Sequence, residues 1–403
     1  MQKMRNSQRR LLIIGASVLQ LPAILKAKEM GFYIGVADYN PNAIGIQYAD
    51  EYFNVSTIDV EGVKKVSKKF RPDGIITLAT DMPMRAIAAA CEACGLPGIS
   101  YETAVKATDK AEMIKAFEEH GVEHPWYFIV PNKDKLDVIM EKITFPCIMK
   151  PTDNAGSRGV VLVHNRQELK DTYEYSHGAS RSGTIIIEEY LQGPEFSIEV
   201  MVINGKAHIL QITDKLTTGA PHFVEIGHSQ PTRQTNEQQE KIQDLTYRAV
   251  KAVGINTGPA HVEMILTKDG PKMVELGARM GGDCITTHLV PLSTGIDMVK
   301  ETIKVACGKT PNIEKKCRRG SAIRYFSTST GILKRIDGVE EAKKIPGIQE
   351  ITIVKEIGTQ ITDIGSSVDR IGFVIAQANT VDEAVKICEK AINEVRISVE
   401  PIL

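Results

Sequence analysis

Strand-length apolar runs alternate with helical patterns along the first hundred residues. The predicted strands are residues 11–14, 33–37 and 74–79, and the predicted helices run up to residue 30 and over 60–70 and 83–94. Strands that alternate with helices in this way indicate a parallel sheet covered by helices. We therefore predict a doubly wound α/β domain over residues 1–100.

After residue 100 the pattern changes to short strands with fewer helices between them. Thr108 and Asp109 can cap a helix that runs to His120, where Gly121 ends it. The strands predicted after it are residues 127–130, 146–150, 160–163, 185–189, 197–203 and 208–213. This texture predicts a mixed α+β domain over residues 101–319.

A third stretch carries strand patterns at residues 322–326, 349–354 and 372–378, followed by one helix over 381–395. We predict that residues 320–403 form a small C-terminal α+β domain that packs on the preceding one.

Composition narrows the class of protein. The chain has 403 residues, with 49 basic and 50 acidic side chains and a net charge of −1. This balance argues against a broad nucleic-acid or anionic-membrane surface. No stretch approaches the ~20 continuous apolar residues of a membrane span. Seven cysteines in so long a chain do not suggest a disulfide framework, so a cytoplasmic protein is expected.

The turn after the first strand is not a dinucleotide-binding fingerprint. Residues 15–20 contain one glycine, Gly15, where the fingerprint needs three, although Asp38 stands near the expected acidic position. An NAD-dependent dehydrogenase is therefore disfavoured. The turn can still place a helix N-terminus near a small anion such as a substrate carboxylate.

Lys150 ends an apolar strand and leads into a loop of small residues. A lysine at the end of a buried strand needs an anionic partner or access to water. The loop over 154–159 contains Asn154, Gly156, Ser157 and Gly159, and its backbone amides can fold over phosphates. Together the lysine and the loop favour a nucleotide phosphate site over a plain hairpin turn.

Another apolar strand runs into Glu188 and Glu189, followed by a turn and Glu195. Adjacent glutamates at a strand end are ordinarily solvated. The functional interpretation is a hinge in which Glu188 contacts an adenine edge and Glu195 contacts ribose hydroxyls.

Glu263 and Glu275 give the sharpest signal. The strand over 260–266 alternates, so that His261 and Glu263 share one face. With Pro271 placed inside a five-residue loop over 267–271, Glu263 falls directly opposite Glu275, and facing carboxylates need a cation between them. Carboxylate oxygens suit Mg²⁺. A two-residue turn would instead put the glutamates on opposite faces, as in an exposed acidic strand.

Arg279 follows Glu275 by four residues, in a glycine-containing stretch that can turn the side chain back toward the pair. A guanidinium there would stabilise charge on a phosphoryl group or an acyl oxyanion. A surface arginine is the alternative.

In this order, these motifs resemble the ATP-grasp superfamily. The resemblance implies a preceding α/β domain, an ATP-grasp domain and a C-terminal domain like that of biotin carboxylase. It implies that ATP is bound by phosphate contacts from Lys110 and Lys150, a loop that contains Asn154, Gly156, Ser157 and Gly159, adenine contacts from Glu188 and Leu191, and a ribose contact from Glu195. It also implies that Glu263 and Glu275 bind Mg²⁺, with Mn²⁺ as an alternative, and that Arg279 assists catalysis.

One position departs from the superfamily pattern. The pattern is usually E-x-N-x-R, but here Gly277 takes the place of the asparagine, so one metal ligand is missing. The same departure occurs in bacterial L-amino-acid ligases, which residues 213–231 also resemble. That likeness implies that Glu225 and His228 lie beside the substrate, in what we predict to be a long loop. Phosphoribosylglycinamide synthetase has a similar layout.

The expected function is that of an ATP-dependent carboxylate–amine ligase, which forms an amide through an acyl phosphate. In this reaction Arg279 and Lys150 neutralise charge, and Glu225 or His228 handles the amine. A carboxylate and an amine are the expected small-molecule partners, and relatives suggest a homodimer. The alternatives are a bicarbonate-activating enzyme like biotin carboxylase and a nucleotide sensor without catalytic activity.

Overall fold

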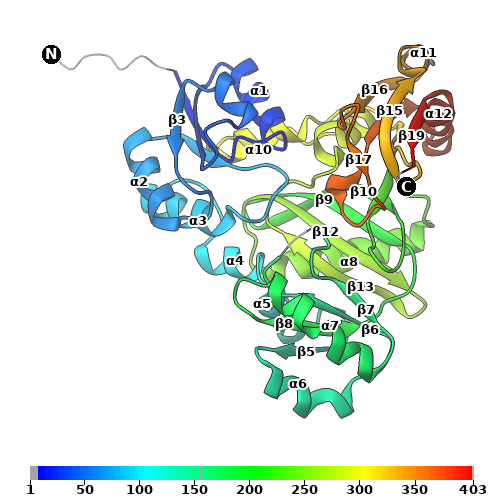
Figure 1. Cartoon of the computed structure of the whole chain (residues 1–403). Coiled ribbons are helices and arrows are strands. Elements are labelled where there is room, and N and C mark those ends of the chain that lie inside the picture. Colours follow the sequence, from blue (N-terminus) through cyan, green and yellow to red (C-terminus); the bar gives the residue numbers. More distant parts are fainter. Residues whose placement is uncertain (1–7, 155, 402–403) are drawn as a thin grey trace.

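The computed structural model describes residues 8–154 and 156–401. Its N-terminal part is a parallel sheet with strand order β3-β2-β1-β4 (Figure 1). The strands and the main helices of this part are β1 (Arg10–Ile14), α1 (Leu21–Glu29), β2 (Tyr33–Asp38), β3 (Glu51–Asn54), α2 (Val60–Phe70), β4 (Gly74–Ile76) and α3 (Met84–Cys94). The predicted doubly wound architecture is confirmed.

Alternate side chains of β1 face opposite layers, as a strand buried on both sides requires. Leu12 and Ile14 pack in one cluster with residues of α2 and α3, whereas Leu11 and Ile13 pack with residues of α1 and α10 (Met298–Ala306). The helix α10 lies almost 300 residues after β1 in the sequence. The N-terminal sheet therefore packs against a later part of the chain.

The turn after β1 is already filled by the protein's own side chains. The carboxylate of Asp38 accepts hydrogen bonds from the backbone N–H of Ala16 at 2.7 Å and of Asn40 at 2.9 Å. Asp38 is therefore engaged in holding the turn rather than directed at a ribose.

Two short helices, α4 (Tyr101–Lys106) and α5 (Lys110–Glu119), lead to a small antiparallel sheet of order β5-β8-β6-β7. Two helices flank its strands, and the elements are β5 (Tyr127–Val130), α6 (Lys133–Ile139), β6 (Cys147–Pro151), β7 (Val161–Val163), α7 (Arg166–Ala179) and β8 (Ile185–Glu189). They form the lobe at the bottom of Figure 1, with its own apolar core.

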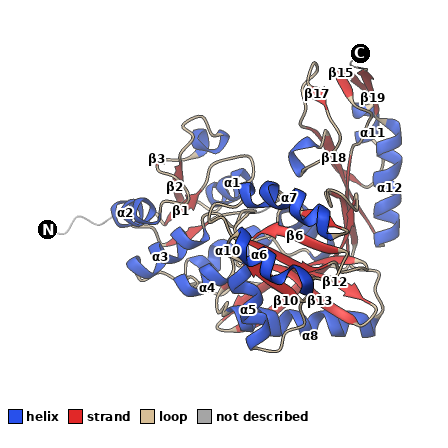
Figure 2. Cartoon of the chain, turned by 60° about the horizontal axis from the view of Figure 1, so that its bottom comes forward, coloured by secondary structure: helices blue, strands red, loops and turns tan. Residues whose placement is uncertain are grey.

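A larger sheet with strand order β13-β12-β9-β10-β11-β14-β18-β16 forms the centre of the described chain. Its strands are β9 (Glu195–Ile203), β10 (Lys206–Thr217), β11 (Glu225–Gln230), β12 (Gly258–Thr267), β13 (Gly270–Gly277), β14 (Gly320–Tyr325), β16 (Ile348–Ile353) and β18 (Gly372–Ala378). Figure 2 shows α8 (Asn236–Val253) below this sheet, and the lobe that contains β6 and the rest of the small sheet above it.

The sheet continues across residue 320, because β14 pairs with β11 on one side and with β18 on the other. Before residue 320 the chain forms α9 (Val290–Thr294), and the C-terminal part adds α11 (Val339–Lys343) and α12 (Val381–Glu394). It also contains a small antiparallel sheet of β15 (Gly331–Asp337), β17 (Gln360–Ile361) and β19 (Arg396–Glu400), whose strands the apolar pattern did not predict. Among the described helices, none is long and apolar enough to cross a membrane.

The prediction of a long loop over 213–231 was wrong. Most of this segment is a hairpin, in which β10 extends to Thr217 and β11 begins at Glu225. The sequence of β11 lacks apolar alternation, but its backbone is paired with strands on both sides, which satisfies its N–H and C=O groups.

Candidate active site

A cleft of about 880 Å³ lies between the small sheet and the large one. It brings together most of the residues singled out in the sequence, namely Lys110, Lys150, Asn154, Gly156, Ser157, Glu188, Leu191, Glu195, Glu225, His228, Glu263, Glu275 and Arg279.

Gly159 is the described residue of the predicted set that does not line the cleft. Its φ is +79°, and a Cβ there would come within 2.6 Å of the Ala179 Cβ at the end of α7. Gly159 therefore lets the loop pack on α7. Ala155, in the middle of the predicted phosphate loop, lies outside the described residues.

Glu263 on β12 and Glu275 on β13 are paired directly across the hairpin, as predicted. The loop that was meant to produce this register was predicted wrongly. Thr267 pairs with Gly270, which leaves a two-residue turn, and Pro271 lies within β13. A β-bulge at Val274 shifts the register by one residue and restores the pairing. Pro271 is tolerated because β13 is an edge strand, where a missing N–H costs little.

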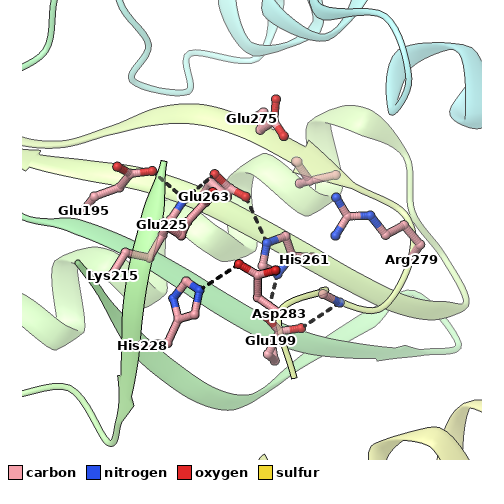
Figure 3. Close-up of polar contacts among 12 residues, drawn as sticks. Glu195, Glu199, Lys215, Glu225, His228, His261, Glu263, Glu275, Arg279 and Asp283 are labelled. Carbon is pink, nitrogen blue, oxygen red and sulfur yellow. Dashed lines mark hydrogen bonds and ion pairs between the residues drawn. The ribbon is translucent and has the colours of Figure 1, made fainter. Parts of the chain in front are cut away.

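Lys215 lies at the centre of the acidic side chains, and sequence reasoning missed it (Figure 3). Its Nζ lies 2.6 Å from Glu195, 2.8 Å from Glu263 and 3.7 Å from Glu225. Burial lowers the pKa of Lys215, but the carboxylates outweigh burial and hold the pKa well above its usual value. The buried ammonium therefore stays charged.

His261 bridges Glu263 to a second buried carboxylate. Its Nδ1 lies 2.5 Å from Glu199, and its Nε2 lies 3.0 Å from Glu263. Burial lowers the pKa of His261, but Glu199 and Glu263 raise it by more than burial lowers it. The net result is a pKa of about 9. Burial would also raise the pKa of Glu263, yet Lys215 and His261 hold it well below its usual range. Glu263 is thus an ionised carboxylate at neutral pH.

Two lysines line the cleft close to each other. Lys110, at the start of α5, lies 2.9 Å from Glu275 and donates to the Asn154 carbonyl at 3.0 Å. Lys150, on β6, lies 2.6 Å from Glu188, and both of these side chains are buried. Burial raises the pKa of Glu275, but Lys110 lowers it more, so Glu275 also stays ionised.

Arg279 forms a two-point ion pair with Asp81, which follows β4 in the N-terminal part. Its Nε and Nη2 donate to the two carboxylate oxygens, each at 2.9 Å. Burial lowers the pKa of Arg279, and Asp81 with the two cleft glutamates raises it above its usual value. The guanidinium is therefore fixed beside the glutamate pair.

The residues in this cleft can be compared with known proteins. Residues 143–287 match the model of the ATP-grasp domain, and residues 324–400 match that of the L-amino acid ligase C-terminal domain 2. The chain is an ATP-grasp ligase. The alanine–anticapsin ligase of Bacillus subtilis is 27% identical over 317 residues, which cover 72% of this chain and 66% of that protein.

Two solved structures are similar over nearly the whole chain. Phosphoribosylglycinamide synthetase from Anaerococcus prevotii aligns with a TM-score of 0.79 at 27% identity, over 98% of this chain and 100% of that one. L-amino acid ligase from Bacillus licheniformis aligns with a TM-score of 0.84 at 24% identity, again over 98% and 100%. The expected ATP-grasp fold is confirmed.

The residues of the ATP-grasp cleft fit a magnesium ion that arrives with a nucleotide. Two ionised carboxylates face each other, and no group of three or more His, Cys, Asp or Glu among the described residues could hold a metal by itself. Glu263 and Glu275 would hold the ion, with nucleotide phosphates and water supplying the remaining oxygens.

The end of the cleft beyond Glu263 contains Glu225, His228 and Asp283. Burial raises the pKa of Glu225, although Lys215 lowers it. His228 is 1% exposed, and its Nε2 lies 3.3 Å from Asp283. Asp283 has a φ of +49° and accepts two hydrogen bonds at 2.8 Å from Arg370, which precedes β18. The C-terminal part therefore completes this end of the site.

Proposed function

We propose that this ATP-grasp ligase joins a carboxylate to an amine through an acyl phosphate. The observation that carries the proposal is the pair of facing, ionised glutamates with Lys110, Lys150 and Arg279 around them in one cleft. Three fixed cations and two carboxylates suit a magnesium triphosphate.

In the first step a carboxylate oxygen of the substrate attacks the γ-phosphorus of ATP. A C–O–P linkage forms, the bond from the γ-phosphorus to the bridging oxygen breaks, and ADP leaves with the electron pair. Lys150 and Arg279 neutralise the charge that develops on the phosphoryl oxygens. Magnesium, when bound by Glu263 and Glu275, would supply further neutralisation of the phosphate charge.

In the second step the amine nitrogen attacks the acyl carbon, and phosphate leaves from the tetrahedral species. Arg279 stabilises the oxyanion. The nitrogen must lose a proton, and Glu225 is the better placed acceptor because its pKa is raised and its side chain is more exposed than that of His228. His228 is buried and directed at Asp283, so we assign it the role of orienting Asp283.

Water must be excluded while the acyl phosphate exists, because water competes with the amine. We infer that the loop containing Gly156 and Ser157 closes over the phosphates once ATP is bound. Amino acids are the proposed substrates, because the C-terminal match is to an L-amino acid ligase domain and the Bacillus relative joins alanine to anticapsin.

The test is ADP release by the purified protein in a matrix of the twenty amino acids, singly and in pairs, with mass detection of dipeptides. Turnover that requires two amino acids, and a product mass equal to their sum less water, is the expected result. ADP release that depends on bicarbonate would favour the carboxylase-like alternative. Nucleotide binding without turnover in any pair would contradict the ligase proposal and favour a sensor.

A further inference from the structure

The backbone at Gly277 approaches Asp81 more closely than any side chain would allow. A Cβ built at position 277 would lie 2.5 Å from Asp81 Oδ1 and 3.0 Å from Arg279 Nε. Real Cβ atoms do not come within 3.0 Å of other heavy atoms. The ion pair between Asp81 and Arg279 therefore fills the space into which an asparagine at 277 would project.

The loop that delivers Asp81 is held in an unusual conformation. Ala79, two residues earlier, has a φ of +60°, which costs a non-glycine residue on the order of 1 kcal/mol. Ala79 also faces Gly282, where an added Cβ would lie 3.6 Å from the Ala79 Cβ. The two loops thus lie close together at Ala79 and Gly282, and this packing places the Asp81 carboxylate beside β13.

The pairing leaves part of the guanidinium available. Of the five N–H groups of an arginine, Arg279 uses two for Asp81 and one for the carbonyl of Met280, at 3.3 Å. The other two, one on each Nη, have no acceptor within the described chain. An arginine whose plane is fixed in this way can offer its two remaining donors to a phosphoryl group or an oxyanion.

We propose that Asp81 is a positioning residue for Arg279 and that Gly277 is the glycine that admits it. Together they take over the place of the usual asparagine of E-x-N-x-R, but they act through the arginine rather than through the metal. The inference rests on phosphoryl transfer within the proposed function and does not depend on which amine is used.

The first measurement compares binding of MgADP with binding of MgADP plus orthovanadate, an analogue of the transferring phosphoryl group. In the wild type, vanadate should tighten MgADP binding. Asp81→Asn should lose at least about tenfold of that enhancement, while its affinity for MgADP alone stays within threefold. A loss of fold would weaken both affinities together. Asp269→Asn, in the exposed turn of the same hairpin, is the matched control and should behave as wild type.

The second measurement is a double-mutant cycle between positions 81 and 277. Gly277→Ala should reduce the vanadate enhancement as Asp81→Ala does, and the double variant should be no worse than either single variant, because both changes remove the same pair. Gly178→Ala, in α7 where an added Cβ meets no atom within 4 Å, controls for the substitution itself.

Three results would overturn the inference: wild-type enhancement retained in Asp81→Asn, additive losses at 81 and 277, or no vanadate enhancement in the wild type. A protein that passes both tests but shows no turnover with paired amino acids would retain the role of Asp81 and lose the ligase assignment. The two failures can therefore be distinguished.

Discussion

Glu263 and Glu275 face each other because two local irregularities cancel: the two-residue turn shifts the hairpin register by one residue, and the bulge at Val274 shifts it back. Without the bulge, every residue of β13 beyond Val274 would face the opposite side of the sheet. A single extra residue in an edge strand therefore decides whether the two carboxylates face each other.

Replacement of Glu275 by Gln should strongly reduce kcat without unfolding the protein. The side chain keeps its shape but loses the charge needed beside magnesium, so kcat should fall by roughly 100-fold or more. ADP release at saturating magnesium gives the readout. The surface variant Glu340→Gln should match the wild type. A Glu275→Gln protein with full turnover would show that the facing pair is not the metal site.

Lys215→Met should destabilise the fold. The substitution leaves Glu195, Glu225 and Glu263 facing one another without the buried ammonium, which should cost about 3 kcal/mol in the free energy of unfolding. The deficit should shrink as the pH falls below about 4.5, the ordinary pKa of a glutamate, because Lys215 holds the pKa of Glu263 well below that value in the folded protein. Urea unfolding at two pH values measures both effects.

Lys206→Met is the matched control for that experiment, because Lys206 begins the same strand and is exposed. Its effect should stay within about 0.5 kcal/mol. Equal effects of the two substitutions would mean that the buried ammonium contributes nothing to stability.

Stability should fall as the pH rises from about 6.5 to 9. The pKa of His261 is about 9 in the folded protein and 6.5 in the unfolded chain, so its proton stabilises the fold fully below pH 6.5. That contribution, as much as about 3 kcal/mol, is lost as the pH approaches 9. His261→Gln should flatten the dependence of the unfolding free energy on pH in this window. His164→Gln, at an exposed position, should keep the wild-type slope.

Arg370→Gln should weaken the attachment of the C-terminal part to the cleft. The change removes both hydrogen bonds to Asp283 and the contact of the guanidinium with the Tyr325 ring, 3.9 Å away. A loss of about 2 kcal/mol in unfolding free energy is expected, because Asp283 is left partly buried and without its cation. The exposed Arg335→Gln is the control, and an equally small effect of both substitutions would show that the Arg370–Asp283 pair does not stabilise the fold.

The sequence was most informative where one local rule sufficed. The helix over 60–70 was predicted at its observed bounds, and in the structure the Asp59 side chain caps it by accepting a hydrogen bond from the Gly62 N–H. Lys215 lies two residues beyond the strand predicted over 208–213, in a segment predicted to be a loop, so no local pattern marked it as a buried lysine.

Other features depend on tertiary contacts that no local pattern reveals. Asp81 lies 198 positions before Arg279, and nothing near either residue indicates the pair. The strand β11 has the composition of a loop, and only its neighbours make it a strand. The bulge at Val274 is equally hidden, because Pro271 fits both a wide loop and an edge strand.

The strand pairing between β11 and β14 has a practical consequence for anyone who trims this protein. A fragment that stops at Arg319 would keep the residues of the cleft up to Asp283, yet it would expose the unpaired N–H and C=O groups along β11 to solvent. An exposed edge strand of this kind can pair with the strands of other chains, which leads to aggregation. The C-terminal segment is thus an integral part of the central sheet. Its removal should produce an insoluble fragment rather than a smaller enzyme.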